Sequence, residues 1–180
     1  MREQTKAFAV WITGLPASGK SSLTAALVRH LELKQVQAVV LESDALRKVF
    51  STNPQYDDKE REYFYSSVAF IGKVLTDCGV SVIFDATANK RAYREPARKA
   101  IARFLEVYVD TPLEVCIQRD PKGIYRKALQ GEGTNVPGLQ ASYEPPEAPD
   151  FVFHGDQNHA EEAAGRIVEI LEKRGMLVRK

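Results

Sequence analysis

The sequence predicts an α/β fold, a three-layer sandwich in which a mostly parallel five-stranded sheet carries helices on both faces. Five short apolar runs alternate along the chain with longer amphipathic segments, which is typical of strands joined by helical crossovers. A glycine-rich turn follows the first apolar run, where such folds turn tightly from strand to helix. The 180 residues suffice for one such domain and are too few for two ordinary ones. We therefore expect a single domain over residues 1–180.

The five apolar runs are short and rich in Val, Ile, Leu and Phe, as buried strands are. They cover residues 8–12, 38–41, 80–84, 105–109 and 151–153. Apolar residues at helical spacing predict helices over residues 21–33, 58–77, 90–104, 113–119, 123–129 and 160–174. Gly79 and Gly175 follow two of these segments, which is typical of helix C-termini.

One long segment, residues 130–150, has neither helical nor strand periodicity and is rich in Gly and Pro. A loop of about 20 residues in a compact domain is more often a lid or a binding loop than a plain connection. A basic segment, residues 119–127, precedes it and can bring Arg or Lys over a phosphate. We therefore predict a lid and substrate loop over about residues 119–149, with Lys127 at the substrate. The alternative is a solvated charged helix.

Charge and cysteine content limit the class of protein. The net charge is +1, from 25 basic and 24 acidic residues, so there is no basic excess of the kind that nucleic-acid binders carry. No apolar run approaches the roughly 20 residues that span a bilayer, and residues 1–6 are too polar for a signal peptide. We expect no nucleic-acid or membrane partner and a cytoplasmic location. Cys78 and Cys116 lie in apolar surroundings and are predicted to be buried free thiols.

The most specific motif is the phosphate-binding loop Gly-Leu-Pro-Ala-Ser-Gly-Lys-Ser between the first strand and the first helix. Its backbone N–H groups can surround an anion at a helix N-terminus. Lys20 adds a charge for the β- and γ-phosphates, and the Ser21 hydroxyl suits Mg²⁺, which prefers oxygen ligands. We expect ATP to contact Gly14, Leu15, Pro16, Ala17, Ser18, Gly19, Lys20 and Ser21.

Polar residues at the end of the second strand are candidates for catalysis, because ligands of parallel sheets bind beyond the carboxyl ends of the strands. Asp44 is predicted to accept the proton of an attacking hydroxyl and to help Ser21 hold Mg²⁺. Arg47, one helical turn later, can bind an anionic group of the acceptor. The alternative is that Asp44 caps a helix and Arg47 is solvated.

The third strand ends in Asp85, which resembles the carboxylate that holds Mg²⁺ or its water in other phosphoryl-transfer enzymes. Asp85 is therefore the second candidate for the base. Arg91 and Arg94 follow near the same edge, one turn apart, and either can meet phosphate or sulfate oxygens. The alternative is that both are ordinary charges on a solvated helix.

Three segments resemble the adenylylsulfate (APS) kinase family. They are residues 109–125, with Asp-Thr-Pro and Arg-Asp-Pro-Lys-Gly-Ile-Tyr; residues 143–149, Tyr-Glu-Pro-Pro-Glu-Ala-Pro; and residues 11–22, which contain the phosphate-binding loop. The resemblance runs over nearly the whole chain. It implies a P-loop kinase fold, ATP with Mg²⁺, and transfer of the γ-phosphoryl group to the 3′-hydroxyl of APS, which gives PAPS for sulfate assimilation. It also implies that a homodimer can form.

The resemblance assigns further site residues. It supports Asp44 and Arg47, adds Ser22 and Arg119 to the ATP site, and makes Arg61 a substrate-binding residue.

The acceptor site departs from the family pattern at several positions. Glu42-Ser43 stand for the family's Asp-Gly before Asp44. Phe64 stands for an Asn and Ala88 for a Ser; of the two aromatic residues that enclose the APS adenine, Tyr56 replaces one and Val136 stands at the other. These residues are still expected at the substrate. The alternative function is an APS-kinase-like enzyme with a different hydroxyl acceptor, and two further alternatives are a non-catalytic nucleotide-binding regulator and a nucleic-acid end kinase.

Overall fold

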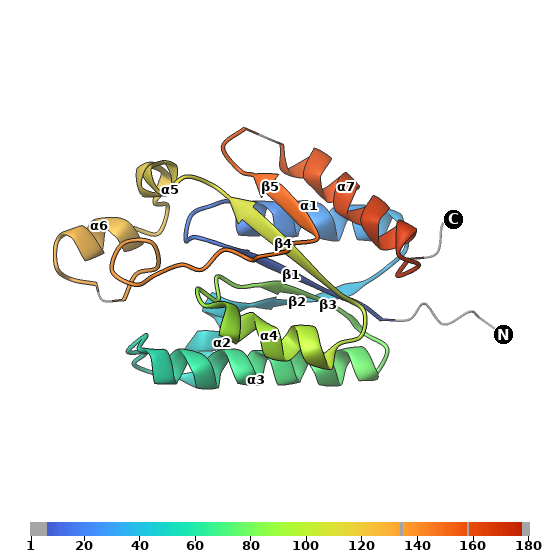
Figure 1. Ribbon diagram of the computed structural model, residues 1–180, viewed down its shortest axis with the longest axis horizontal. Helices are drawn as coiled ribbons and strands as arrows, with labels where there is room; N and C mark the ends of the chain where they lie inside the picture. The colour runs from blue at the N-terminus through green and yellow to red at the C-terminus, as the bar shows by residue number, and fades with distance from the viewer. Residues whose placement is uncertain (1–6, 134, 158, 178–180) are drawn as a thin grey trace.

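A computed structural model describes residues 7–133, 135–157 and 159–177. Its centre is a five-stranded sheet in the order β2-β3-β1-β4-β5, and all four neighbouring pairs are parallel (Figure 1). The strands are β1 (Ala9–Gly14), β2 (Ala38–Glu42), β3 (Ser81–Asp85), β4 (Phe104–Asp110) and β5 (Phe151–His154). The parallel five-stranded sheet predicted from the sequence is therefore confirmed.

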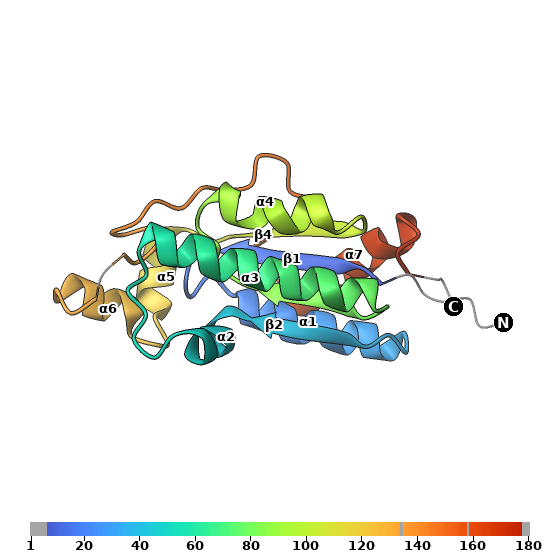
Figure 2. The same cartoon turned by 90° about the horizontal axis from the view of Figure 1, so that it is seen from below.

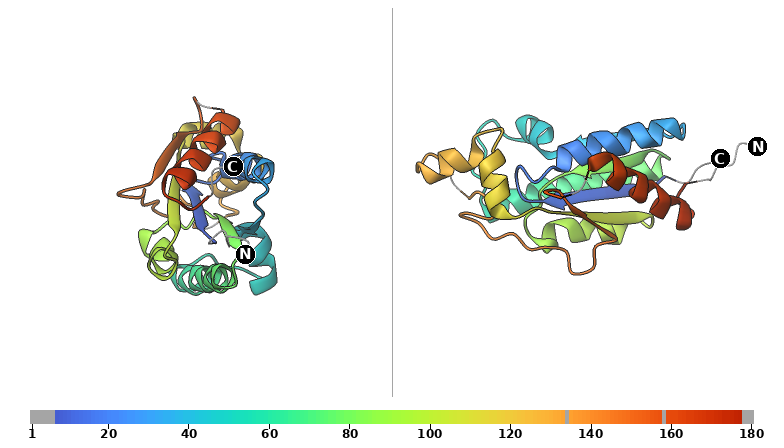
Figure 3. Two further views of the ribbon diagram at one scale, coloured as in Figure 1. Left: turned by 90° about the vertical axis from the view of Figure 1, so that its right-hand side faces the viewer. Right: turned by 90° about the horizontal axis from the view of Figure 1, so that it is seen from above.

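Helices cover both faces of the sheet, which confirms the three-layer sandwich (Figures 1 and 3). Helices α1 (Lys20–Leu33) and α7 (Ala160–Lys173) pack together on one face. Helices α2 (Ser43–Phe50), α3 (Asp58–Asp77) and α4 (Arg91–Ala100) lie on the other. Helices α5 (Leu113–Arg119) and α6 (Ile124–Leu129) extend beyond the end of the sheet where β1 leads into α1 (Figure 1).

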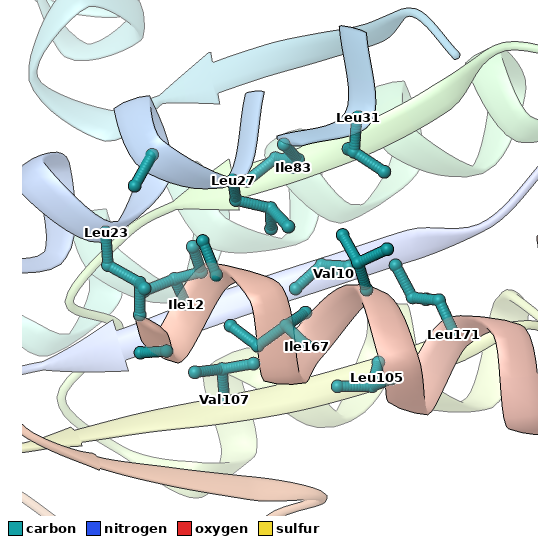
Figure 4. Packing of buried hydrophobic residues seen from close by; sticks show 14 of the residues in the cluster. Val10, Ile12, Leu23, Leu27, Leu31, Ile83, Leu105, Val107, Ile167 and Leu171 are labelled. Atoms are coloured by element: carbon teal, nitrogen blue, oxygen red, sulfur yellow. The ribbon is translucent and has the colours of Figure 1, made fainter. Parts of the chain in front are cut away.

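The core lies on both faces of β1, because alternate side chains of a strand point to opposite faces. Val10 and Ile12 pack with Leu27 of α1 and Ile167 of α7 (Figure 4). Trp11, on the opposite face, stacks on Phe84 with ring centroids 4.5 Å apart. Since β1 is completely buried, the loop that follows it is held at a rigid end of the sheet.

Three sequence predictions about the elements are wrong. The helix predicted over residues 90–104 ends at Ala100, and Phe104 begins β4, because Ile101 and Phe104 continue the helical spacing without belonging to the helix. Helix α2 was missing from the predicted helices, although Arg47 had been placed one helical turn after Asp44. Cys78 is exposed at the end of α3, whereas Cys116 is buried as predicted.

Within the described part of the chain, no helix is both long and apolar enough to cross a lipid bilayer. The expectation about a signal peptide concerns residues 1–6, which lie outside the described residues.

Candidate active site

A cavity of about 600 Å³ opens at the carboxyl edge of the sheet, between the loop after β1 and the start of α6. Parallel sheets bind ligands at this edge. Nine of the residues predicted for the site line the cavity: Pro16, Ala17, Gly19, Lys20, Ser21, Ser22, Asp44, Asp85 and Arg119. The phosphate-binding loop and both candidate bases therefore line the same cavity.

The loop after β1 has the conformation that an anion site needs. A Cβ atom on Gly14 would lie 2.6 Å from the Val109 carbonyl oxygen, so only glycine fits there. Gly19 has a φ of 109° at the N-terminus of α1, a conformation that glycine adopts at little cost. The backbone N–H groups at the start of α1 consequently lie at the end of the helix that borders the cavity, where the helix dipole favours negative charge.

Lys20 is buried at the first position of α1. Its Nζ donates hydrogen bonds to the carbonyl oxygens of Gly14, at 3.2 Å, and Leu15, at 2.8 Å. Burial lowers the pKa of Lys20 below its ordinary value, and the carboxylates of Asp85 and Asp44 oppose that shift. A buried ammonium group held at this loop is suited to bind anionic phosphates.

The two candidate bases differ in surroundings. Asp85 is buried at the end of β3, whereas Asp44 is exposed in the first turn of α2. Asp44 Oδ2 accepts a hydrogen bond of 2.5 Å from Lys122 Nζ, and this bond raises the pKa of Lys122. Lys122 also lines the cavity. Lys122 was part of the basic segment in the sequence but was not singled out there as a site residue.

The donor set of this cavity fits Mg²⁺. The Ser21 hydroxyl and the carboxylates of Asp44 and Asp85 line it and present oxygen atoms, which this hard cation prefers. Among the described residues, no group of three or more His, Cys, Asp or Glu side chains is arranged to hold a metal ion. These few oxygen ligands suit a cation that also binds nucleotide phosphates.

Contacts from α5, α6 and the end of β4 hold the phosphate-binding loop. Arg119 Nη1 donates to the Ser18 carbonyl oxygen at 3.5 Å, and its Nη2 donates to the Gly155 carbonyl oxygen at 2.8 Å. Thr111 Oγ1 donates to the Ser18 carbonyl oxygen at 2.8 Å, and the Tyr125 hydroxyl donates to that of Pro16 at 3.0 Å. The basic segment is therefore attached, through Arg119 and Tyr125, to the phosphate-binding loop.

A second group of predicted residues lies beside the cavity. It surrounds Arg47, which follows Asp44 by one turn on α2. The guanidinium group of Arg47 is buried and lies 3.9 Å from the ring centroid of Phe64 and 4.8 Å from that of Tyr56. Such contacts are attractive because the ring faces are electron-rich. The structure thus brings Arg47, Tyr56 and Phe64 together.

Glu60 organises this group and was missed in the sequence. Its Oε1 accepts a hydrogen bond from Arg47 Nη1 at 3.0 Å. Its Oε2 accepts the backbone N–H groups of Gln55, at 2.6 Å, and Tyr56, at 2.7 Å. One carboxylate therefore joins α2, the following loop and α3. A glutamate in the first turn of a helix has an ordinary capping role as well, so the sequence held no signal that distinguished it.

Arg61 connects the same loop to the segment after β3 and to the lid. Its Nε donates to the Tyr56 carbonyl oxygen at 2.8 Å, and its Nη1 donates to Asn89 Oδ1 at 2.6 Å. Its Nη2 donates to the Asn135 carbonyl oxygen at 2.7 Å. Ala88, next to Asn89, is buried, and its N–H donates to the Tyr65 hydroxyl.

Backbone strain is concentrated at these positions. Among the described non-glycine residues, five have positive φ angles, and four of them belong to the two groups above: Ala17, Tyr56, Ala88 and Asn135. Each such conformation costs on the order of 1–3 kcal/mol and persists where the surroundings enforce it, often at functional sites. The strain supports a functional role for both groups.

Some predicted residues are not brought to these groups. Arg91 is exposed, and its guanidinium group pairs with Glu147 and the Pro145 carbonyl oxygen. Lys127 is exposed on α6 and does not line the cavity, in contrast to Lys122.

Two further predicted residues are buried in structural roles. Val136 packs with Cys116, Tyr125 and Ala128 in a small core of the lid. Arg94 is buried as well and pairs with Glu106, so it is not the solvated helix charge that was considered as an alternative.

The chain is similar to known proteins over nearly its whole length. The family model for adenylylsulphate kinase matches residues 6–154. The adenylyl-sulfate kinase of Halothermothrix orenii is 35% identical over 177 residues, which cover 98% of this chain and 95% of the relative. That of Myxococcus xanthus is 38% identical over 174 residues, with 94% of each chain covered. A solved structure of the Mycobacterium tuberculosis APS kinase CysC, in complex with AMPPNP and APS, superposes with a TM-score of 0.87 at 34% identity, covering 93% of this chain and 98% of that one.

Proposed function

This chain belongs to the adenylylsulphate kinase family, and we propose that it transfers the γ-phosphoryl group of ATP to the 3′-hydroxyl of APS, which gives PAPS. The observation that carries the proposal is that the phosphate-binding loop, two carboxylates and two buried arginines lie at one edge of the sheet, in a chain that matches this family along its length. The cavity beside Lys20 takes ATP, and the neighbouring group around Arg47 and Arg61 takes the acceptor.

Binding of ATP replaces contacts that the loop now makes with itself. The phosphates receive the N–H groups at the start of α1 and the Lys20 ammonium group, which exchanges its bonds with the carbonyls of Gly14 and Leu15 for bonds with phosphate oxygens. Arg119 contacts the adenine end of the nucleotide. Ser21 and Asp44 would hold Mg²⁺ together with the phosphates, and the ion would neutralise negative charge on the transferring group.

Asp44 is the proposed base. In the transfer step the acceptor hydroxyl oxygen forms a bond to the γ-phosphorus, the bond to the β-phosphate bridging oxygen breaks, and Asp44 accepts the hydroxyl proton. Before that step Lys122 has to leave Asp44, to which it is bonded at 2.5 Å. The departing Lys122 is close enough to the same cavity to place its charge on the phosphates. Asp85 is the second candidate for the base.

A second candidate acceptor is favoured by one observation. Of the two positions expected to enclose the adenine, Val136 carries no aromatic ring and packs inside the lid, so Tyr56, 38% exposed, is the one that offers a ring for stacking on a purine. A base stacked on one side only loses part of an interaction worth about 1–3 kcal/mol. An anionic hydroxyl compound other than APS would depend less on that stacking.

The experiment that tests both candidates measures ATP consumption with Mg²⁺ and identifies products by mass. APS is compared with nucleoside monophosphates, sugar alcohols and 5′-hydroxyl oligonucleotides. Efficient formation of PAPS supports the first candidate. Turnover of another acceptor without turnover of APS supports the second, and no phosphorylation of any hydroxyl would overturn both in favour of a non-catalytic nucleotide-binding protein.

A further inference from the structure

Asn89 is a buried polar residue in the segment after β3, and the phosphoryl transfer proposed above gives it no task. Only 1% of the residue is exposed. Its Oδ1 accepts a hydrogen bond from Arg61 Nη1 at 2.6 Å, and its Nδ2 donates one to the Ser142 carbonyl oxygen at 2.8 Å. A buried amide that is bonded through both polar atoms holds its partners firmly, because breaking either bond leaves a polar group without water. Asn89 therefore joins α3 to the end of the loop that follows α6.

Arg61 extends this connection to two further segments. Its Nε donates to the Tyr56 carbonyl oxygen at 2.8 Å, and its Nη2 donates to that of Asn135 at 2.7 Å. These three partners of the guanidinium group stand at or next to a residue with a positive φ angle, which is 58° at Tyr56, 59° at Asn135, and 39° at Ala88, the neighbour of Asn89. Such turns are costly and persist where their surroundings enforce them. One guanidinium group, fixed by one amide, therefore holds three strained turns.

The three strained turns carry positions that are expected at the substrate, namely Tyr56, Ala88 and Val136, the residue after Asn135. We propose that Asn89 is a positioning residue for the acceptor, which acts by holding these three walls of the acceptor site in place. The proposal rests on the function proposed above and adds to it a buried residue that does not line the cavity for ATP.

Residues 135–142, which we call the lid turn, depend most on Asn89, because it holds both of their ends. Ser142 is bonded to Asn89 directly, and Asn135 is bonded to it through Arg61. Figure 2 shows the chain returning from α6 past the beginning of α4, and Asn89 lies just before that helix. Loss of the Asn89 side chain would therefore release the lid turn at both ends.

The lid turn is compact and packs on the phosphate-binding loop. The Val136 carbonyl oxygen accepts the N–H group of Ala141 at 3.0 Å, and the Gly138 N–H group donates to the Ala141 carbonyl oxygen at 2.8 Å. Gly138 has a φ of 87°, and a Cβ atom there would lie 2.7 Å from Leu15 Cδ2. Close packing at Leu15 limits the position of the lid turn on one side, and Asn89 limits it on the other.

The chain after the lid turn has anchors of its own. Arg94 Nη2 donates to the Glu144 carbonyl oxygen at 2.8 Å, and the backbone N–H group of Arg91 donates to Glu144 Oε2 at 2.9 Å. The Tyr143 hydroxyl lies 3.0 Å from Thr13 Oγ1. These bonds do not involve the side chain that holds the lid turn. Its loss should therefore free the lid turn and leave the following residues attached to the sheet.

Hydrogen exchange and initial-rate kinetics of the full chain test this role with Asn89→Leu. Leucine is similar in size, but it can neither accept from Arg61 nor donate to Ser142. In the ligand-free enzyme we expect amide exchange in the lid turn to be faster by about tenfold or more, with exchange in β1 and α1 unchanged. With ATP and APS as substrates, the KM for APS should rise about tenfold or more, while the KM for ATP stays within about twofold.

The matched control is Gln37→Leu, which replaces an exposed amide side chain just before β2. Gln37 lies at the end of the sheet opposite to the cavity, so both exchange and kinetics should equal those of the wild type. An Asn89→Leu variant with wild-type exchange in the lid turn, or with equal rises in both KM values, would overturn the proposal.

Asn89→Asp carries the test if the leucine variant does not fold. An aspartate can still accept from Arg61, but it cannot donate to the Ser142 carbonyl oxygen. Exchange in the lid turn should again be faster, while exchange at Gln55 and Tyr56 stays as in the wild type because Arg61 remains in place. Unchanged exchange in the lid turn would overturn the proposal. The exchange measurements use no substrate, so a wild type that fails to phosphorylate APS contradicts the proposed function and not the role of Asn89.

Discussion

Lys20 and Asp44 have different tasks at the cavity, and their substitutions should separate these tasks. Lys20 is buried and bonded only to carbonyls of its own loop among the contacts described above. Lys20→Ala removes a charge from the phosphate site, so we expect turnover to fall by at least about 10²-fold, together with weaker ATP binding. Steady-state kinetics and calorimetric ATP titration measure the two effects. Lys99→Ala is the control, because Lys99 is exposed on α4, in a pair with Glu95.

Asp44→Asn keeps the shape of the side chain and removes its basicity. We expect ATP binding within about threefold of the wild type and a loss of turnover of about 10²-fold or more, as for a general base. The measurement is single-turnover kinetics with bound ATP. Near-normal turnover in Asp44→Asn together with a large loss in Asp85→Asn would assign the base to Asp85.

Substitution of Glu60 should weaken binding of the acceptor without weakening binding of ATP. In Glu60→Gln the remaining oxygen can still accept the N–H groups of Gln55 and Tyr56, while the new NH₂ group faces the Arg47 guanidinium and cannot accept from it. Loss of one charge-assisted hydrogen bond is worth about 1.5–3 kcal/mol, so we expect the KM for the acceptor to rise about tenfold or more with the KM for ATP unchanged. Initial-rate kinetics checks this.

The control for that prediction is Glu95→Gln, an exposed carboxylate on α4. An equal rise of both KM values in Glu60→Gln would mean that Glu60 supports the whole fold instead of positioning Arg47.

At the scale of elements, the last part of the lid and substrate loop is held to the sheet by a buried arginine of α4. Arg94 Nε donates to Glu106 Oε1 at 2.7 Å, and its Nη2 donates to the Glu144 carbonyl oxygen at 2.8 Å. Arg94→Met leaves Glu106 buried with one partner fewer, and we expect the free energy of unfolding to fall by about 3 kcal/mol.

Urea denaturation of Arg94→Met and Arg98→Met measures that contribution. Arg98 pairs with the other oxygen of Glu106, but 36% of its side chain is exposed, so its loss should cost about 1 kcal/mol. Equal losses in the two variants would contradict a special role for the buried arginine.

Local periodicity predicted the strands well because each one is a short apolar run that the sheet buries. The same rule extended the helix after Arg91 too far, since Ile101 and Phe104 are apolar for reasons of tertiary burial. The phosphate-binding loop was predictable because its chemistry lies within eight consecutive residues.

The rest of the site was not predictable, because its contacts join distant segments. Lys122 meets Asp44 across 78 positions of the chain, and Arg61 meets Asn135 across 74. Nothing in the local spacing distinguishes Lys122 from Lys127, so the sequence alone did not single out Lys122, the lysine that lines the cavity.

At the scale of the whole molecule, two largely covered tyrosines predict a loss of stability in alkali. Burial is the main cause that raises the pKa of Tyr93 to about 12 and that of Tyr143 to about 12, from an ordinary value of 10.0. Between pH 10 and 12 the unfolded chain therefore binds fewer protons at these groups than the folded chain does, so their contribution to stability is complete below pH 10 and is lost as pH rises through 12.

Urea denaturation at several pH values in this window measures that loss. Tyr143→Phe removes one of these ionising groups, and the stability of this variant should fall less steeply with pH, by up to about one proton in the slope. The difference in slope from the wild type is informative even though the lysines titrate in the same range. An identical slope in both proteins would show that Tyr143 ionises at the same pH when folded and unfolded.

The position of β1 in the middle of the sheet has a consequence for synthesis of the chain. Ala9 pairs with Val82 on one side and with Phe104 on the other. The strand that carries the phosphate-binding loop is made first, yet it waits for β3 and β4 before it can be hydrogen-bonded on both edges. While fewer than about 110 residues have emerged from the ribosome, the nascent chain would therefore lack a formed nucleotide site. ATP can thus act as a folding ligand only late in translation.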